Sequence, residues 1–325
     1  MKGQHRIVIR NKRIQYDFVL KRNLTVIRGD SATGKTTLID MVREFDENGE
    51  ASGVTLQCDK ACTTLSGKRW ETELQEIRDS IVFIDEGNEF IFTNEFAACI
   101  QKTDNYYVIA TREGIPSLPY SVNEIYGIRN SGKYGELKQT YQEFYHLYNV
   151  EDYRKNIKPY QILTEDSNSG YQFFKTVSGR KGIECKSAEG KSNIFAVTSE
   201  YMKQEQAQPL VIIADGAAFG SEMEKVTNLI RGHQEIVLYL PESFEWLILK
   251  ANLVEDKGIS LVLNAPEDYI ESEKYFSWER FFTAFLIQKT RDSYLRYAKK
   301  ELNSSYLNEK ISERILDVIE RIELD

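Results

Sequence analysis

VIRGDSATGKTTLIDMV, residues 26–42, decides the fold of the N-terminal half of the chain. It starts with the end of an apolar segment that predicts a buried strand, and an amphipathic helical pattern begins at Lys35. Between them lies a loop bounded by Gly29 and Gly34, whose glycines let the backbone curl until its N–H groups point inward. Because the N-terminal end of a helix also carries partial positive charge, the segment predicts a cradle for phosphate groups.

The loop matches a specific nucleotide-binding pattern. Residues 29–36 fit G-x-x-x-x-G-K-[ST] at every fixed position, which predicts ATP and Mg²⁺ as cofactors. Lys35 is expected to act as a catalytic residue that reaches the β- and γ-phosphates, and the hydroxyl of Thr36 to bind Mg²⁺. The sequence lacks the Asn-Lys-x-Asp pattern of guanine-binding proteins, which favours adenine. The predicted nucleotide-binding residues are Gly29, Asp30, Ser31, Ala32, Thr33, Gly34, Lys35, Thr36 and Thr37.

The segment SIVFIDE, residues 80–86, supplies the carboxylates that such a site needs. Asp85 follows four consecutive apolar residues at the end of a predicted buried strand, and we expect it to complete the magnesium site with Thr36. Glu86 is placed to polarise a water for attack on the γ-phosphate, which predicts a second catalytic residue. An ordinary acidic strand end is the alternative interpretation of this Asp-Glu pair.

The composition predicts a soluble protein of two domains. Its 325 residues, 41% of them hydrophobic, suffice for two separate cores. No apolar run reaches the roughly 18 residues of a membrane-spanning helix, and the first twenty residues do not resemble a signal peptide. We therefore expect a cytoplasmic protein without a membrane partner. The net charge of −8 argues against a generally basic surface but leaves a local nucleic-acid groove open.

Strand and helix patterns alternate in both halves of the chain, which predicts α/β domains with parallel sheets. In the first half, a hairpin pattern precedes the cradle, and the further strands are predicted at residues 54–58, 80–86 and 105–113. In the second half, the predicted strands are residues 160–165, 192–199, 209–215 and 235–240. The predicted organisation is a domain at 1–115, a Tyr-rich extension and linker at 116–159, a smaller domain at 160–260 and a helical tail at 261–325.

Acidic residues stand at the ends of the predicted strands in the second half. Glu165 ends the first strand and Asp215 the third, and Glu242 and Glu245 come just beyond the fourth. Because the carboxyl ends of parallel strands line the crevice of an open sheet, these acids can converge on one divalent ion such as Mg²⁺. Glu165 and Asp215 are the predicted catalytic and metal-binding residues. Helix caps or strand-end acids of a non-catalytic domain are the alternative.

On these motifs, Val26 to Arg112 resembles the core of a P-loop NTPase. The resemblance implies a sensor for the γ-phosphate at Thr111 or Arg112, which end the segment VIATR. TLSGKRW, residues 64–70, resembles the signature loop of ABC-type ATPases and precedes the Asp-Glu pair by one helix. Only about 30 residues separate it from Lys35, too few for the helical subdomain of that family. A divergent ABC-type ATPase stays an alternative.

Residues 160–253 resemble a Toprim domain, the metal-binding fold of topoisomerases, bacterial primases and the OLD-type nucleases that join an ATPase to a Toprim unit. In that family the first strand ends in a glutamate and the third in Asp-x-Asp. Glu165 and Asp215 match the first two of these acids, whereas Ala217 stands at the position of the second aspartate. The departure puts nuclease activity in doubt, unless Glu222 or Glu245 replaces the missing carboxylate.

The sequence thus predicts an α/β protein with a P-loop NTPase domain, a smaller Toprim-like domain and a helical C-terminal tail. The expected function is Mg²⁺-dependent ATP hydrolysis coupled to a domain that acts on or binds DNA or RNA, as in phage or mobile-element conflict. Closure against a second copy in a homo-oligomer would complete the nucleotide site. A nucleotide-switched regulatory protein without nuclease activity is the alternative.

Overall fold

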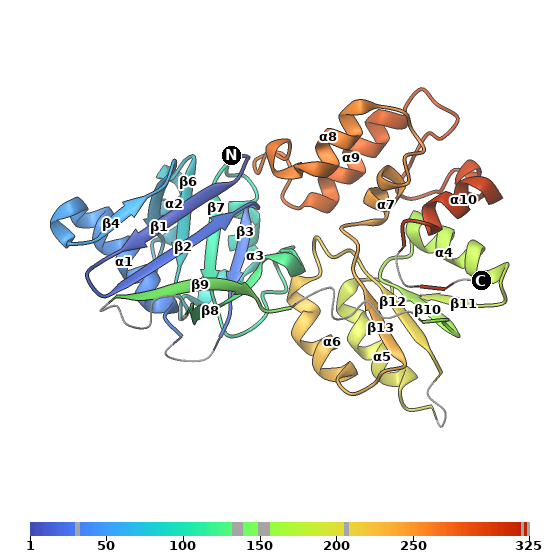
Figure 1. Cartoon of the computed structure of the whole chain (residues 1–325), viewed down its shortest axis with the longest axis horizontal. Coiled ribbons are helices and arrows are strands. Elements are labelled where there is room, and N and C mark those ends of the chain that lie inside the picture. The colour runs from blue at the N-terminus through green and yellow to red at the C-terminus, as the bar shows by residue number, and fades with distance from the viewer. Residues whose placement is uncertain (30–32, 132–138, 149–156, 205–207, 320–321, 324–325) are drawn as a thin grey trace. The chain divides into compact units, whose positions relative to one another are not determined.

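The structure is a computed structural model that describes residues 1–29, 33–131, 139–148, 157–204, 208–319 and 322–323. The chain divides into two compact units: residues 1–148 with 265–277, and residues 149–264 with 278–325. Both are α/β, the first built on a nine-stranded mixed sheet and the second on a four-stranded parallel sheet (Figure 1). Among the described residues, no helix combines the length and the apolar character that crossing a membrane requires.

The sheet of the first unit has the order β4-β1-β2-β9-β8-β3-β7-β6-β5. The five strands from β8 to β5 run parallel to one another, whereas β1 pairs antiparallel with β2 and β4, and β8 antiparallel with β9. The prediction of a parallel sheet in this unit is therefore correct only for these five strands. The strands are β1 (His5–Arg10), β2 (Ile14–Leu20), β3 (Leu24–Ile27), β4 (Thr55–Gln57), β5 (Ala61–Thr64), β6 (Ser80–Ile84), β7 (Tyr106–Ala110), β8 (Ile125–Asn130) and β9 (Thr140–His146).

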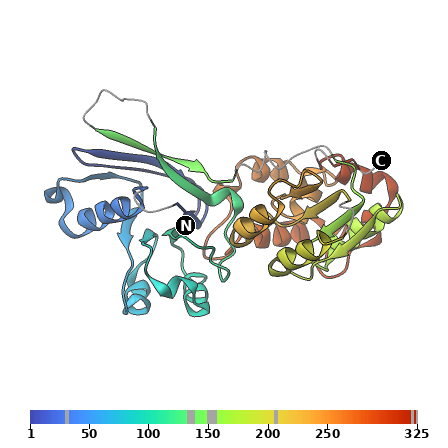
Figure 2. The same cartoon turned by 90° about the horizontal axis from the view of Figure 1, so that it is seen from below.

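The sheet curls around helix α1 (Lys35–Asn48). β4 and β5 lie at opposite ends of the strand order, yet only residues 58–60 join them, a reach of at most about 14 Å. The two edges must therefore approach each other. The apolar face of α1, with Leu38 and Val42, shares one core with Ile7 of β1 and with Phe83 of β6. Figure 2 shows α1 below the dark-blue strands β1 and β2.

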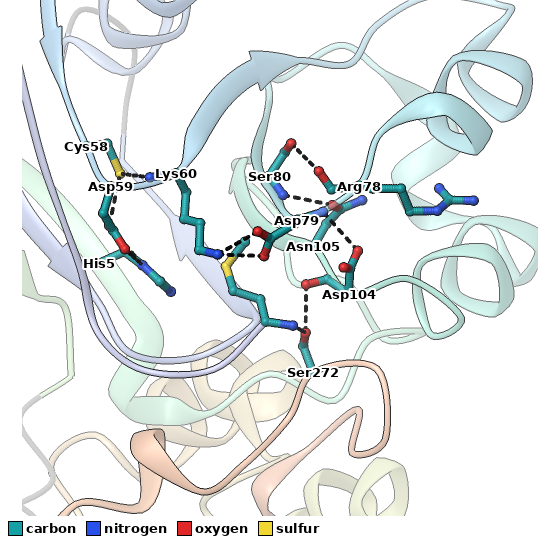
Figure 3. Close-up of polar contacts among 11 residues, drawn as sticks. His5, Cys58, Asp59, Lys60, Arg78, Asp79, Ser80, Asp104, Asn105 and Ser272 are labelled. Carbon is teal, nitrogen blue, oxygen red and sulfur yellow. Dashed lines mark hydrogen bonds and ion pairs between the residues drawn. The ribbon is translucent and has the colours of Figure 1, made fainter.

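Polar contacts fix the place where the two edges meet (Figure 3). Asp59 accepts a hydrogen bond from His5 of β1 at 2.8 Å, and Lys60 pairs with Asp79 at 2.6 Å, just before β6. The N–H of Asp79 in turn donates to the carboxylate of Asp104, before β7. The connection from β4 to β5 is thus tied to strands of both halves of the sheet.

The face of the parallel strands that lies away from α1 carries α2 (Trp70–Glu76) and α3 (Asn94–Ile100). Trp70, Phe90 and Phe96 form one aromatic cluster, and Phe96 contacts Tyr107 of β7 edge to face. Helices therefore cover both faces of the parallel strands, as a parallel sheet requires.

The stretch predicted as an extension and linker, 116–159, belongs in part to this sheet. Its residues form β8, which pairs with β3, and β9, which pairs with β2. Phe144 of β9 stacks on Phe18 of β2 with ring centroids 4.1 Å apart. The prediction was wrong here because the alternation of aromatic and polar residues is a strand pattern with a period of two.

The second unit has the parallel order β11-β10-β12-β13. Right-handed connections in this order place α4 on one face and α5 and α6 on the other. The packing agrees, since α5 contacts α6, and Phe173 and Phe174 of α4 contact Phe244 of α7. The elements are β10 (Gln161–Thr164), α4 (Ser169–Gly179), β11 (Glu184–Ser187), α5 (Ile194–Tyr201), β12 (Leu210–Ile213), α6 (Met223–Ile230), β13 (Ile236–Tyr239) and α7 (Phe244–Lys250).

Two predictions for the second half were wrong. Residues 192–199, predicted as a strand, lie largely in α5, and the strand before β12 is the short β11 at the sheet edge. The predicted helical tail is divided, because residues 265–277 belong to the first unit. The remaining helices are α8 (Lys257–Asn264), α9 (Trp278–Thr290), which packs on α7, and α10 (Glu309–Leu316).

Candidate functional site

The cradle lies between β3 and the N-terminal end of α1. Gly29 has φ +148° and Gly34 has φ +93°, conformations that residues with a side chain rarely adopt. The hydroxyl of Tyr16 donates to the carbonyl oxygen of Gly34 at 2.9 Å, and a Cβ at Gly34 would lie 2.9 Å from that hydroxyl. Glycine is therefore required there by both backbone and space. Three of the predicted residues, Asp30, Ser31 and Ala32, lie outside the described residues.

Lys35 is turned back onto the loop. Its side chain is 4% exposed, and Nζ donates to the carbonyl oxygen of Gly29 at 2.5 Å and lies 3.4 Å from Oγ1 of Thr33. Nζ also lies 3.6 Å from Oε2 of Glu86. A buried ammonium group thus lies against Gly29 and Thr33, next to the predicted water-activating carboxylate.

The two predicted magnesium ligands meet. Thr36 is exposed at the start of α1, and its hydroxyl donates to Oδ1 of Asp85 at 3.4 Å. Asp85 follows β6 and is fixed by the N–H of Glu86 at 2.8 Å and by Asn88, whose side chain donates to the carbonyl oxygen of Asp85. Burial raises the pKa of Asp85. A hydroxyl and a carboxylate so close together are the oxygen donors that Mg²⁺ prefers, so these residues fit the ion. Thr37 is also exposed at this end of α1.

Glu86 lies between two cations. Nη2 of Arg112 is 2.8 Å from Oε1 of Glu86 and Nε is 3.3 Å from Oε2, while Lys35 stands on the other side. These partners lower the pKa of Glu86, with the hydrogen bond from Arg112 as the largest cause. Of the two candidate sensors, Thr111 is buried and bonded to Glu113 at 3.0 Å, whereas Arg112 faces the site.

A cleft of about 450 Å³ opens beside Glu86 and Arg112. Ile91, Phe92 and Thr111 are among its other lining residues, so it is partly apolar. The neighbouring loop of TLSGKRW contacts this region, since the N–H of Gly67 donates to Oδ1 of Asn88 at 3.0 Å. No motif in the sequence indicated that Asn88 joins the Asp-Glu pair to that loop.

In the second unit, Glu165 and Asp215 also meet. They follow β10 and β12, adjacent strands between which the strand order reverses, and the N–H of Asp215 donates to Oε2 of Glu165 at 2.9 Å. Burial raises the pKa of Glu165 to about 7. Burial and the neighbouring acids raise the pKa of Asp215 well above its ordinary value. The carboxylates of Glu165 and Asp215 therefore lie close together in a poorly hydrated part of the second unit.

Residues of the C-terminal segment complete this acidic cluster, and the sequence analysis missed all of them. Tyr297 and Thr283 each donate to Oε1 of Glu245 at 2.9 Å, and Lys299 pairs with Glu279 of α9. These residues come from far along the chain and form no motif with Glu165 or Asp215. The packing of α9 on α7 brings them in.

The cluster does not fit a divalent ion. Its cavity of about 20 Å³ is lined by Lys299 as well as by Glu165, Asp215 and Glu245. In the described part of the chain, no three or more His, Cys, Asp and Glu residues are arranged to hold a metal. Ala217 is buried, and its N–H donates to the carbonyl oxygen of Glu242 at 3.2 Å. Glu222, an alternative ligand in the sequence analysis, accepts a hydrogen bond from Ser221.

The search of protein-family models finds none that matches the chain. The search of curated proteins finds no match either.

Proposed function

We propose that the first unit binds a nucleoside triphosphate, with ATP favoured, and hydrolyses it with Mg²⁺. The approach of Thr36 Oγ1 to Asp85 Oδ1 at 3.4 Å carries this proposal, because it unites a loop and a strand end that lie 49 residues apart. The glycine-bounded loop, the buried Lys35 and the adjacent Glu86 support it. The parallel order of β8, β3, β7, β6 and β5 supports a P-loop NTPase fold.

Each residue of the site has a role in the proposed reaction. Backbone N–H groups at the start of α1 and Nζ of Lys35 bind the phosphates. Thr36 and Asp85 would hold Mg²⁺, which supplies positive charge for the phosphate oxygens. Glu86 orients the attacking water and accepts its proton. Arg112, at the edge of the cleft, is placed to bind the γ-phosphate.

The ion pairs of Glu86 connect binding to reaction. While Lys35 and Arg112 both contact Glu86, they stabilise its charge and make it a weak base. Phosphate oxygens compete for both cations, because an oxyanion binds guanidinium and ammonium groups as a carboxylate does. A bound triphosphate therefore frees Glu86 to accept a proton.

The test compares Lys35→Ala and Glu86→Gln with the exposed control Lys102→Ala in the purified protein. We expect Lys35→Ala to abolish nucleotide binding, measured with a fluorescent ATP analogue. Glu86→Gln should keep binding but lose hydrolysis by about 100-fold or more, the usual size of a general-base effect. Lys102→Ala should bind and hydrolyse ATP like wild type. Hydrolysis by Lys35→Ala at the wild-type rate would refute the proposal.

For the second unit, we propose a Toprim-like domain that binds DNA or RNA. The parallel sheet and the acids at the ends of β10 and β12 support this fold. The pairing of Lys299 with Glu279 favours the candidate without nuclease activity, a nucleotide-switched binding protein. Cleavage of plasmid and single-stranded DNA with Mn²⁺, beside ATP hydrolysis, separates the candidates. Cleavage that Asp215→Asn abolishes while hydrolysis survives would support a nuclease instead.

A further inference from the structure

We propose that the ammonium group of Lys299 is the resident cation of the acidic cluster in the second unit, in the place that a divalent ion would take. The cluster is the set Glu165, Asp215, Glu245 and Glu279, and Asp166 lines the same cavity. The inference concerns the second unit alone and does not depend on nucleotide hydrolysis in the first.

The cluster gathers acids from four elements. Glu165 follows β10, Asp215 follows β12, Glu245 lies in α7 and Glu279 in α9. Glu165, Asp215 and Glu245 line one cavity of about 20 Å³, and Glu279 pairs with Lys299 on its wall, so these negative charges lie close together. Glu245 is only 2% exposed, so water screens these charges poorly. A positive charge is needed at this place.

Hydrogen bonds of the segment around Lys299 hold this residue beside the cluster. The N–H of Ser169, at the start of α4, donates to the carbonyl oxygen of Lys299 at 3.0 Å. Two residues earlier, Tyr297 contacts both Ser169 and Glu245 through its hydroxyl. The segment is therefore anchored on both sides of the cavity. Burial opposes the charge of Lys299, but Glu279, Glu245 and Asp215 outweigh this and raise its pKa above the ordinary value.

Lys191, the second lysine near the cluster, binds a backbone carbonyl group instead of a carboxylate. Lys191 donates to the carbonyl oxygen of Ala218 at 2.9 Å. Burial lowers the pKa of Lys191, although Glu165, Glu222 and Glu279 act in the opposite direction. Lys299 is thus the lysine whose charge the acids stabilise most.

The size of the cavity argues against Mg²⁺ in the same place. A cavity of about 20 Å³ has room for one or two water molecules. Mg²⁺ gives up its water reluctantly and keeps several water ligands in proteins. With Lys299 on its wall, the cavity lacks the space for a hydrated divalent ion.

The first measurement is a Mn²⁺ titration of the full chain without nucleotide, followed by the EPR signal of free Mn²⁺. Asp85→Asn is the background, so that the first unit lacks its predicted magnesium ligand. We expect no Mn²⁺ site at the cluster below millimolar concentration. Lys299→Met should bind Mn²⁺ at least tenfold more tightly, and adding Asp215→Asn should abolish that gain. The proposal would be overturned if the protein that keeps Lys299 bound Mn²⁺ tightly and Glu165→Gln removed that binding.

The second measurement is thermal unfolding with Mn²⁺ and with EDTA. Neither should change the wild-type melting temperature of the second unit. Lys299→Met should melt several degrees lower, whereas the adjacent exposed Lys300→Met is the matched control and should not. If Lys299→Met does not fold, Lys299→Met/Glu279→Gln should restore folding, because it removes one charge of each sign. Lys299→Met melting like Lys300→Met, or no recovery in the double variant, would contradict the proposal.

Discussion

Replacement of Glu165 by glutamine should reduce the dependence of the stability of the second unit on pH. Burial raises the pKa of Glu165 from 4.5 to about 7. An acid whose pKa is higher in the folded than in the unfolded state binds its proton more tightly when folded. Its contribution therefore lowers the free energy of unfolding as the pH rises from about 4.5 to about 7, and stays constant above that range.

The size of the effect follows from the shift. A rise from 4.5 to about 7 is roughly 2.5 pKa units, and each unit corresponds to about 1.4 kcal/mol, which gives about 3.5 kcal/mol. This is an upper value, because Asp215 shares the cavity and the two acids titrate together. Glutamine stays neutral at all these pH values, and its side-chain oxygen can still accept the hydrogen bond from the N–H of Asp215.

The assay is urea unfolding between pH 5 and pH 8, followed by tryptophan fluorescence. A Trp70→Phe background removes the tryptophan of the first unit, so that Trp246 and Trp278 report on the second. We expect wild type to lose up to about 3 kcal/mol more than Glu165→Gln across this range. Glu184→Gln, at an exposed acid of the same sheet, is the control and should follow wild type. If the free energy of unfolding changed with pH in the same way in wild type and in Glu165→Gln, the reasoning would be refuted.

Three further predictions follow from single contacts. Gly34→Ala places a Cβ on backbone at φ +93°, so fluorescent-nucleotide titration should show at least tenfold weaker affinity. Arg112→Ala should reduce the preference for ATP over ADP by about tenfold in competition binding, whereas Arg129→Ala, in a similarly exposed ion pair, should not. Gly216→Ala puts a Cβ 2.8 Å from the carbonyl oxygen of Leu240, and should cost about 1–3 kcal/mol in urea unfolding. A nucleotide affinity, an ATP preference or a free energy of unfolding equal to that of wild type would contradict the prediction for Gly34, Arg112 or Gly216, respectively.

The sequence predicted the elements around the cradle because their signals are local. Glycine spacing and the apolar run before Asp85 are properties of a few neighbouring residues, and the structure has the strands β3 and β6 and the helix α1 at those places. The order in which β7 separates β3 from β6 was beyond such signals. It depends on which strands pair, and pairing is decided by contacts between distant residues.

Two failures show where local pattern is ambiguous. Residues 192–199 alternate well enough for a strand, yet Ile194, Thr198 and Tyr201 form the buried face of a helix. Lys299 was not predicted for the acidic cluster, because it joins the cluster only through the packing of a distant segment. A charged residue on a polar segment carries no sign of the acids it will meet after folding.

The division of the first unit between two stretches of chain has a consequence for its synthesis. Glu267 accepts a hydrogen bond from the N–H of Gly3, and Phe276 accepts one from the side chain of Asn23. A ribosome that has released residue 148 must add roughly 120 more residues before these acceptors exist, about 6 to 24 s at ordinary rates of translation. During that time the nascent first unit has all of its strands but lacks residues 265–277. A gene fragment that stops at residue 148 would make this transient species permanent.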